Sequence, residues 1–140
     1  MLIIPEDKKQ YVSRFIADAG IYYIATLNKH LASISCSRAF LMMHGEIYFG
    51  VGNDTQVYQQ LLENHHIEIM ATNSHGHTLK IKGIVEFSKH LEYGKKVVRH
   101  LPQLKRYYND LTGYSMMMFK IRDPHVSLYD DDGDGYTFTY

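Results

Sequence analysis

Three apolar runs lie close together near the start of the chain: IYYIATLN at residues 21–28, LASISCSRAFLMM at 31–43 and EIYFG at 46–50. The polar pairs Lys29-His30 and His44-Gly45 separate them. β-Branched and aromatic residues favour strands, and connections this short join only antiparallel neighbours. The stretch therefore predicts an antiparallel meander of three strands, onto which the rest of the chain packs.

Five further segments have the composition of strands, and they follow the meander in sequence. Gly83 lies inside the longest of them and predicts a bulge or bend, because glycine weakens a regular strand. The dipeptide Asp123-Pro124 is expected to separate the strand at residues 114–122 from the strand at residues 125–129. The segments cover residues 67–72, 78–87, 114–122 with 125–129, and 136–140. Strands joined in this way, without repeated strand–helix alternation, predict a mainly β fold with flanking helices, an antiparallel closed or split β-barrel.

Helical periodicity occurs in three places. Residues 6–19 carry apolar side chains at helical spacing and are followed by Gly20, a typical left-handed cap. A second helix is expected over residues 56–63, where Asn53, Asp54 or Thr55 would serve as the N-cap. The free backbone amides at such a helix start attract anions, although most capped helices bind none. A longer helical region is expected over residues 88–113, interrupted by Pro102.

Length and composition restrict the classes of protein that remain. A chain of 140 residues fits one domain, 1–140, because this length buries roughly two-thirds of the unfolded surface. Fifteen basic and fifteen acidic residues cancel, which disfavours nucleic acid and membrane surfaces as partners. The absence of a signal-like N-terminus and the single Cys36 predict a cytoplasmic protein.

The middle run alternates in polarity. Ser33, Ser35 and Ser37 share one face of the expected strand, and Ile34 and Cys36 share the other. We expect the Ile34 and Cys36 face to pack on the core, which makes Cys36 a buried structural thiol. The serine face is then polar and available to a ligand, to solvent or to a second subunit.

The order of these elements resembles the pyridoxamine 5'-phosphate oxidase-like, FMN-binding split-barrel family. The resemblance covers residues 10–129, and it implies a split β-barrel that pairs as a homodimer and holds FMN at the interface. The matching phrases are AGIYYIATL (19–27), GEIYF (45–49), TQVYQQLLEN with IEI (55–64 and 67–69), LKIKG (79–83) and FKIR (119–122).

The resemblance also implies where a flavin would bind, and there the sequence departs from the family. Family members grip the flavin phosphate with an arginine-rich phrase and with a basic residue at a helix start. This chain has Ser33–Cys36 and Asp54–Gln56 at those positions. Losing two charge-assisted hydrogen bonds of about 1.5–3 kcal/mol each weakens phosphate binding by a factor of order 100 to 10,000.

The remaining candidates for cofactor binding combine hydroxyl groups, an amide, one cation and the strand end that lies against the flavin in the family. Arg38 shares the Ile34 face by strict alternation, so a bulge or an open barrel edge would be needed to bring it into the groove. No catalytic residue is assigned, because a bound flavin would itself perform the redox chemistry. The candidates are Ser35, Ser37, Arg38, Phe49, Gly50, Thr55 and Gln56.

Several other groups of residues resemble parts of binding sites. His75 and His77 lack a third fixed ligand for zinc, and the Asp130–Asp134 run lacks the glutamate that completes a calcium loop, so no metal site is expected. Six tyrosines offer rings that could line an aromatic groove, although most are expected at core edges. They are Tyr22, Tyr23, Tyr48, Tyr58, Tyr107 and Tyr108.

Two functions from different classes follow. The first is an FMN-dependent oxidoreductase of unknown substrate, acting as a homodimer with flavin and substrate as its small-molecule partners. The second is a homodimeric split barrel that has lost its flavin and acts as a non-enzymatic ligand-binding or sensing module. In a third hypothesis, the groove binds haem or a deazaflavin, with histidines as axial ligands of the haem.

Overall fold

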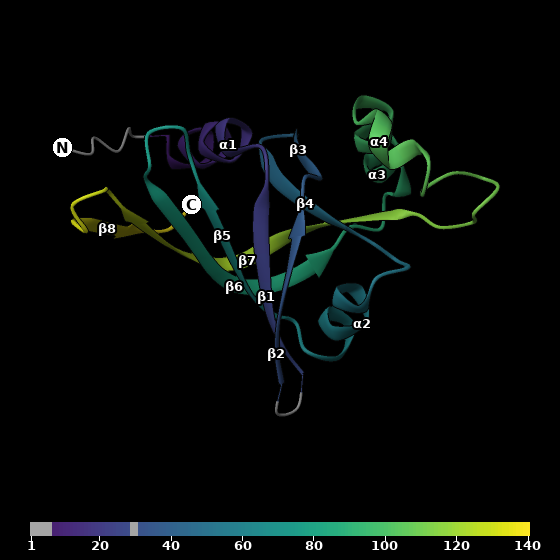
Figure 1. The fold of residues 1–140 in the computed structure, drawn as a ribbon, viewed down its shortest axis with the longest axis horizontal. Helices are drawn as coiled ribbons and strands as arrows, with labels where there is room; N and C mark the ends of the chain where they lie inside the picture. The colour runs from purple at the N-terminus through teal and green to yellow at the C-terminus, as the bar shows by residue number, and fades with distance from the viewer. Residues whose placement is uncertain (1–6, 29–30) are drawn as a thin grey trace.

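The computed structural model describes residues 7–28 and 31–140, and all strands within these residues join one curled antiparallel sheet (Figure 1). The strands are β1 (Tyr22–Asn28), β2 (Leu31–Ser37), β3 (Phe40–Met43), β4 (Glu46–Gly52), β5 (His66–Thr72), β6 (Thr78–Phe87), β7 (Met116–Tyr129) and β8 (Gly135–Phe138). Their order is β2-β1-β5-β6-β7-β4-β3, and β8 pairs with β7. The sheet is a half-barrel with helices outside it, which confirms the mainly β split-barrel fold expected from the sequence.

The helices lie where the periodicity predicts them, with shorter bounds in the third region. They are α1 (Lys8–Ala19), α2 (Gln56–Glu63), α3 (Leu91–His100) and α4 (Pro102–Lys105). Gly20 ends α1 in the left-handed conformation, with φ of 76°, and the Asp7 carboxylate caps its start by accepting from the Gln10 amide. The expected start of this helix at Glu6 and the turn at Lys29-His30 lie outside the described residues.

The prediction of a three-strand meander is wrong for its middle strand. The run at residues 31–43 breaks at Arg38 and Ala39, and its halves lie at opposite ends of the sheet order. β2 pairs with β1, whereas β3 pairs with β4 across the His44-Gly45 turn. The physical reason is a long-range bond: the Ala39 carbonyl accepts from the buried Tyr22 hydroxyl, so the chain leaves the β1 ladder at this point.

The predicted irregularity at Gly83 is confirmed. Lys82 pairs with His125 and Ile84 pairs with Arg122, so Gly83 alone faces Asp123 and Pro124. At this point β7 has one residue more than β6. Asp123 accommodates the extra residue by adopting a positive φ of 52°, and Pro124 has no backbone N–H that would be left without a partner. The expected break into two strands is therefore a bulge inside the single 14-residue strand β7.

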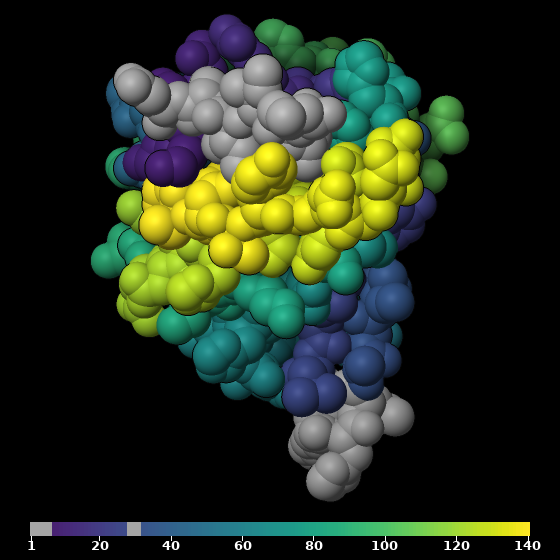
Figure 2. Space-filling view, turned by 90° about the vertical axis from the view of Figure 1, so that its left-hand side faces the viewer, coloured from purple at the N-terminus to yellow at the C-terminus, as the bar shows by residue number. Residues whose placement is uncertain are grey.

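The buried residues form two clusters. The main cluster fills the curl of the sheet and includes Phe49, whose ring centroid lies 5.2 Å from that of Tyr22 and 6.0 Å from that of Phe119. The smaller cluster lies between α3 and the sheet and includes Met116 and Met118. Figure 2 shows the C-terminal residues, including β8, as a yellow band across one face of the molecule. Among the described residues, no helix has the length and apolarity needed to cross a membrane.

Candidate functional site

Two of the expected cofactor residues, Ser37 and Gly50, meet in the structure and are bonded to each other. The Ser37 hydroxyl donates to the Gly50 carbonyl at 2.7 Å and accepts from the Ala39 amide at 3.1 Å. The Gly50 amide donates to the Tyr22 hydroxyl at 3.0 Å. Since these groups already have protein partners, a ligand at Ser37 or Gly50 would have to displace an internal hydrogen bond.

Phe49 and Gly50 face the interior of the protein. Phe49 is fully buried in the main cluster. An added Cβ at Gly50 would lie 2.5 Å from Met118 Sδ and 2.9 Å from Ala39 Cβ. The missing side chain of Gly50 therefore allows residues of the smaller core cluster, in the same chain, to pack closely against its backbone.

Thr55 and Gln56 begin α2, as the sequence predicts. The Thr55 hydroxyl accepts from the Tyr58 amide at 3.3 Å and donates to the Gly52 carbonyl at 2.7 Å, so it is the N-cap. Gln56 is exposed in the first turn of the helix. The two residues lie at the positive end of the helix dipole, but the Thr55 hydroxyl is already hydrogen-bonded within the helix start.

Tyr108 closes over this helix start. Its hydroxyl donates to Asp54 Oδ1 at 2.9 Å, and an added Cβ at Gly52 would collide with it. Burial raises the pKa of the Tyr108 phenol well above its usual value near 10, and the hydrogen bond to Asp54 and its negative charge raise the pKa further. A protonated phenol bonded to a carboxylate thus lies beside the amides that an anionic phosphate would need.

The two faces of β2 are the reverse of those predicted. Ile34 is 76% exposed and Cys36 is exposed, so the expectations of an apolar core face and of a buried thiol are wrong. The serine face points toward α2: the Ser33 hydroxyl accepts from Gln60 Nε2 at 3.0 Å, and Gln60 Oε1 accepts from the Thr26 hydroxyl. Gln60 is 4% exposed, so the polar atoms are buried but paired, which makes the serine face compatible with the interior.

Ser35 lies between Ser33 and Ser37 on this face and is half-buried. Arg38, the cation expected to help with phosphate, lies elsewhere. Its Nη1 reaches the Gly20 carbonyl at 3.5 Å, and its side chain lines a cavity with His100. The structure therefore separates Arg38 from Thr55 and Gln56 at the start of α2.

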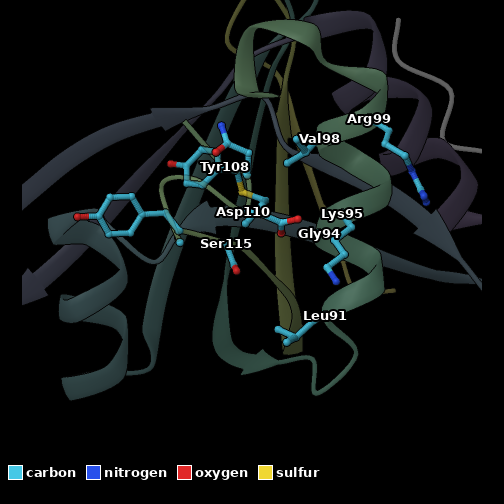
Figure 3. A pocket seen from close by; sticks show the side chains of 12 residues that line it. Leu91, Gly94, Lys95, Val98, Arg99, Tyr108, Asp110 and Ser115 are labelled. Carbon is cyan, nitrogen blue, oxygen red and sulfur yellow. The ribbon is translucent and has the colours of Figure 1, made fainter. Parts of the chain in front are cut away.

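A larger cavity of about 470 Å³, here called the α3 cavity, opens between α3 and the segment that follows α4. Figure 3 shows Leu91 and Val98 directed from α3 toward this segment, Asp110 facing them, and Arg99 directed away. The cavity therefore combines an apolar wall with a few polar groups. Its lining residues are Leu91, Gly94, Lys95, Val98, Arg99, Tyr108, Asn109, Asp110, Gly113, Tyr114, Ser115 and Met116.

Local structure fixes both walls of the α3 cavity. An added Cβ at Gly94 would collide with the Met116 carbonyl, so glycine allows α3 to lie directly on β7. On the opposite wall, Asn109 Nδ2 donates to the Lys105 carbonyl at 2.7 Å, and its Oδ1 accepts from the Leu111 and Thr112 amides. These bonds hold the segment after α4 in a defined conformation without regular secondary structure.

Sequence reasoning missed this cavity and all of its residues except Tyr108. The available signal was the helical region ending in the Asn109–Gly113 turn, which places polar and aromatic residues together. The tyrosines that could have lined an aromatic groove lie mainly in the core or at its edge, as expected: Tyr22 is buried, Tyr48 packs on Tyr93 and Tyr58 packs on Phe87.

The acidic turn before β8 brings the carboxylates of Asp130, Asp131 and Asp132 within 4.8 Å of one another. Asp130 Oδ1 already accepts from the Asp132 and Asp134 amides, at 3.0 and 2.9 Å. These bonds are those of a tight turn, which agrees with the expected hairpin.

Comparison with known proteins identifies the fold. No family model and no curated protein matches the sequence. A NimC/NimA family protein from Clostridium acetobutylicum superposes with a TM-score of 0.81 at 20% identity, over 94% of this chain and 92% of that chain.

Two further solved structures share the fold. A Clostridium acetobutylicum protein related to general stress protein 26, of the pyridoxinephosphate oxidase family, gives a TM-score of 0.67 at 14% identity, over 96% of both chains. A heme-binding protein from Mycobacterium smegmatis gives 0.72 at 16% identity, over 99% of this chain and 60% of that chain. The fold is thus a split barrel of the pyridoxamine 5'-phosphate oxidase-like kind, in agreement with the resemblance read from the sequence.

Proposed function

We propose that this protein is a homodimeric split barrel that binds a small organic ligand in the α3 cavity and does not depend on a flavin. The bond between Tyr108 and Asp54 carries the proposal. It places a carboxylate at the start of α2, where the resemblance implies a basic phosphate ligand. A phosphate near Asp54 would be repelled by the like charge of its carboxylate, which is exposed.

The α3 cavity supports the choice of ligand site. Ligand pockets of proteins are typically about 300–1,000 Å³, apolar in most of their lining and equipped with a few polar groups, and this cavity meets those criteria. Leu91, Val98 and Met116 offer an apolar wall, whereas Lys95 and Asp110 offer charges of opposite sign. These features favour a compact organic molecule with at least one polar group.

The outer face of the sheet supports the homodimer. Tyr23 lies opposite Cys36 on β2 and Met70 on β5, and Ala25 lies opposite Ile34, so these side chains form a strip across three strands. Tyr23, Met70 and Ile34 are 44%, 40% and 76% exposed. An exposed apolar strip that reaches the edge strand β2 favours a protein contact, and a second copy of this chain, as the resemblance implies, is the partner we propose.

FMN remains the second candidate, now for an oxidoreductase of unknown substrate. The observation that favours it is the fold shared with a protein of the pyridoxinephosphate oxidase family. Haem is a lesser alternative, suggested by the heme-binding neighbour. The residues that line the α3 cavity include no histidine, whereas a cavity of about 540 Å³ beside β1, β5 and β6 is lined by His66 and His125 among others. The single, exposed Cys36 supports a location in the reducing cytoplasm.

The first test is the visible absorption spectrum of the untagged protein, followed by titration with FMN. We expect a colourless protein that binds FMN weakly. Replacing Asp54 and Gln56 together by lysine should tighten FMN binding at least about tenfold, because a charge-assisted hydrogen bond contributes about 1.5–3 kcal/mol. Gln59→Lys combined with Glu63→Lys makes the same total change of charge at exposed positions away from the start of α2 and should leave FMN binding unchanged. Flavin bands retained through gel filtration by the unaltered protein would overturn the flavin-free assignment.

The second test addresses the α3 cavity itself. 1-Anilinonaphthalene-8-sulfonate, a fluorescent aromatic anion, should bind there and brighten. Leu91→Glu places a carboxylate at the cavity and should lower this fluorescence severalfold. Leu111→Glu is the matched control, since Leu111 is 99% exposed and does not line the cavity. Equal fluorescence of the two variants would exclude the α3 cavity as the binding site of the probe.

A further inference from the structure

A smaller cavity of about 270 Å³, here called the Arg38 cavity, shares no lining residue with the α3 cavity. It lies where the end of α1, the strand β3 and the end of α3 meet, at the end of the molecule where Figure 1 draws these three elements close together. Arg38 reaches it from the break between β2 and β3, and His100 reaches it from the last turn of α3. Elements far apart in the sequence thus bring a guanidinium and an imidazole to one hollow.

The guanidinium of Arg38 has unused hydrogen-bonding capacity. Its one hydrogen bond among the described residues is the 3.5 Å contact of Nη1 with the Gly20 carbonyl, at the upper limit for such a bond. Within the described part of the chain, the ion pairs are Lys9–Glu46 and Lys120–Glu86, and neither involves Arg38 or His100. An arginine fork has five N–H donors, so most of them are available to an anion.

The floor of the Arg38 cavity is apolar. Val97 is buried, and Phe40, Leu41 and Leu101 are half-buried around it. A surface arginine usually extends over polar or flat surface into water, where an anion gains little from it. Arg38 and His100 are themselves exposed, but they line a hollow whose apolar floor can bury the body of an organic molecule, so the apolar contact adds to the charge-assisted hydrogen bond.

We propose that the Arg38 cavity binds a small organic carboxylate, with Arg38 and His100 holding the carboxylate group and the apolar floor holding its hydrocarbon body. The planar guanidinium matches a carboxylate through two parallel hydrogen bonds. The apolar floor favours an organic anion over inorganic phosphate, which has no apolar surface to bury. The small volume favours a single ring or a short chain. This site is independent of the ligand proposed for the α3 cavity.

Benzoate is the probe, because it joins one carboxylate to one apolar ring. In amide-correlation NMR of the full-length protein, benzoate should cause saturable shifts centred on Arg38, Phe40 and Leu101. Benzyl alcohol keeps the ring without the charge, and inorganic phosphate keeps a charge without the ring. Both should bind at least about tenfold more weakly, since a hydrogen bond to a charged group contributes about 1.5–3 kcal/mol.

Arg38→Ala should weaken benzoate binding about ten- to a hundredfold. Arg14→Ala is the matched control, because Arg14 is an exposed arginine on α1 that does not line the cavity. The comparison of benzoate with benzyl alcohol needs no variant, so a misfolded Arg38→Ala protein would not prevent a decision. Equal binding of benzyl alcohol or phosphate, unchanged affinity in Arg38→Ala, shifts centred elsewhere, or no shift at millimolar benzoate would each overturn the proposal.

Discussion

The Tyr108 hydroxyl donates a hydrogen bond of 2.9 Å to Asp54 Oδ1 across 54 positions of sequence. It joins the segment that follows α4 to the start of α2, and it covers Gly52 at the end of β4. The same contact therefore forms one wall of the α3 cavity and occupies the helix start at which the sequence suggested a phosphate.

Tyr108→Phe should lower the free energy of unfolding by about 0.5–1.5 kcal/mol, the usual net contribution of one hydrogen bond. Urea denaturation measures it, and Tyr107→Phe is the matched control because Tyr107 is 54% exposed. Combining Tyr108→Phe with Asp54→Ala should cost less than the sum of the single changes, because both remove the same bond. Strict additivity would show that the bond contributes nothing in solution.

Stability should fall when the pH rises above about 10, the ordinary pKa of tyrosine. Burial raises the pKa of Tyr22 and, together with Asp54, that of Tyr108, so the folded protein keeps both phenols protonated longer than the unfolded chain does. Their stabilising contribution is complete below the unfolded pKa and is lost as the pH rises toward the folded values. Urea denaturation at about pH 8 and about pH 11 measures the loss. It should be smaller in Tyr108→Phe, and an identical loss in that variant would contradict the role of Tyr108.

Gln60→Ala should destabilise the protein by about 2–4 kcal/mol, because it opens a cavity and leaves Thr26 and Ser33 without their partner. Gln59→Ala changes the same residue type at the next, exposed position and should stay within about 0.5 kcal/mol. Thermal or chemical denaturation compares the two. A loss at Gln60 no larger than that at Gln59 would mean that the polar network does not anchor α2 on β1 and β2.

Gly94→Ala should destabilise by about 2 kcal/mol or more, although alanine favours helices, because its methyl group would collide with the Met116 carbonyl. Lys95→Ala, at the neighbouring exposed position, is the control for helix propensity. Denaturation midpoints of the two variants give the measurement. Stabilisation by Gly94→Ala would show that α3 is free to move away from β7.

Ile34→Asp should convert a dimer to a monomer, because it places a charge on the apolar strip of β2. Light scattering after gel filtration should give twice the chain mass of 16.3 kDa for the unaltered protein and about the chain mass for the variant. Leu111→Asp, at an exposed site away from the strip, should remain dimeric. A monomeric unaltered protein would remove the dimer from the proposed function.

Local chemistry made much of the fold predictable. The cap at Gly20 and the irregularity at Gly83 depend on residues adjacent in the chain, and the structure confirms both. Of the three N-cap candidates for α2, Asn53, Asp54 and Thr55, the structure selects Thr55. The positions of the strands also followed from composition, and the split barrel followed from their order. The buried face of β2 could not be predicted, because alternation identifies two faces without deciding which one is buried.

Sequence by itself determined the approximate positions of most strands and helices, since caps, turns and side-chain periodicity act over a few residues, but it did not determine the break at Arg38 and Ala39 or the continuity of β7. Tertiary structure alone decided that Ser33 is paired in the interior through Gln60, and that Tyr108 meets Asp54. It also decided that the Arg38 side chain lines a cavity with His100 instead of the expected flavin groove. The physical reason is that burial and pairing depend on contacts between residues distant in the chain, and a buried hydrogen-bond partner makes a polar side chain as suitable for the interior as an apolar one.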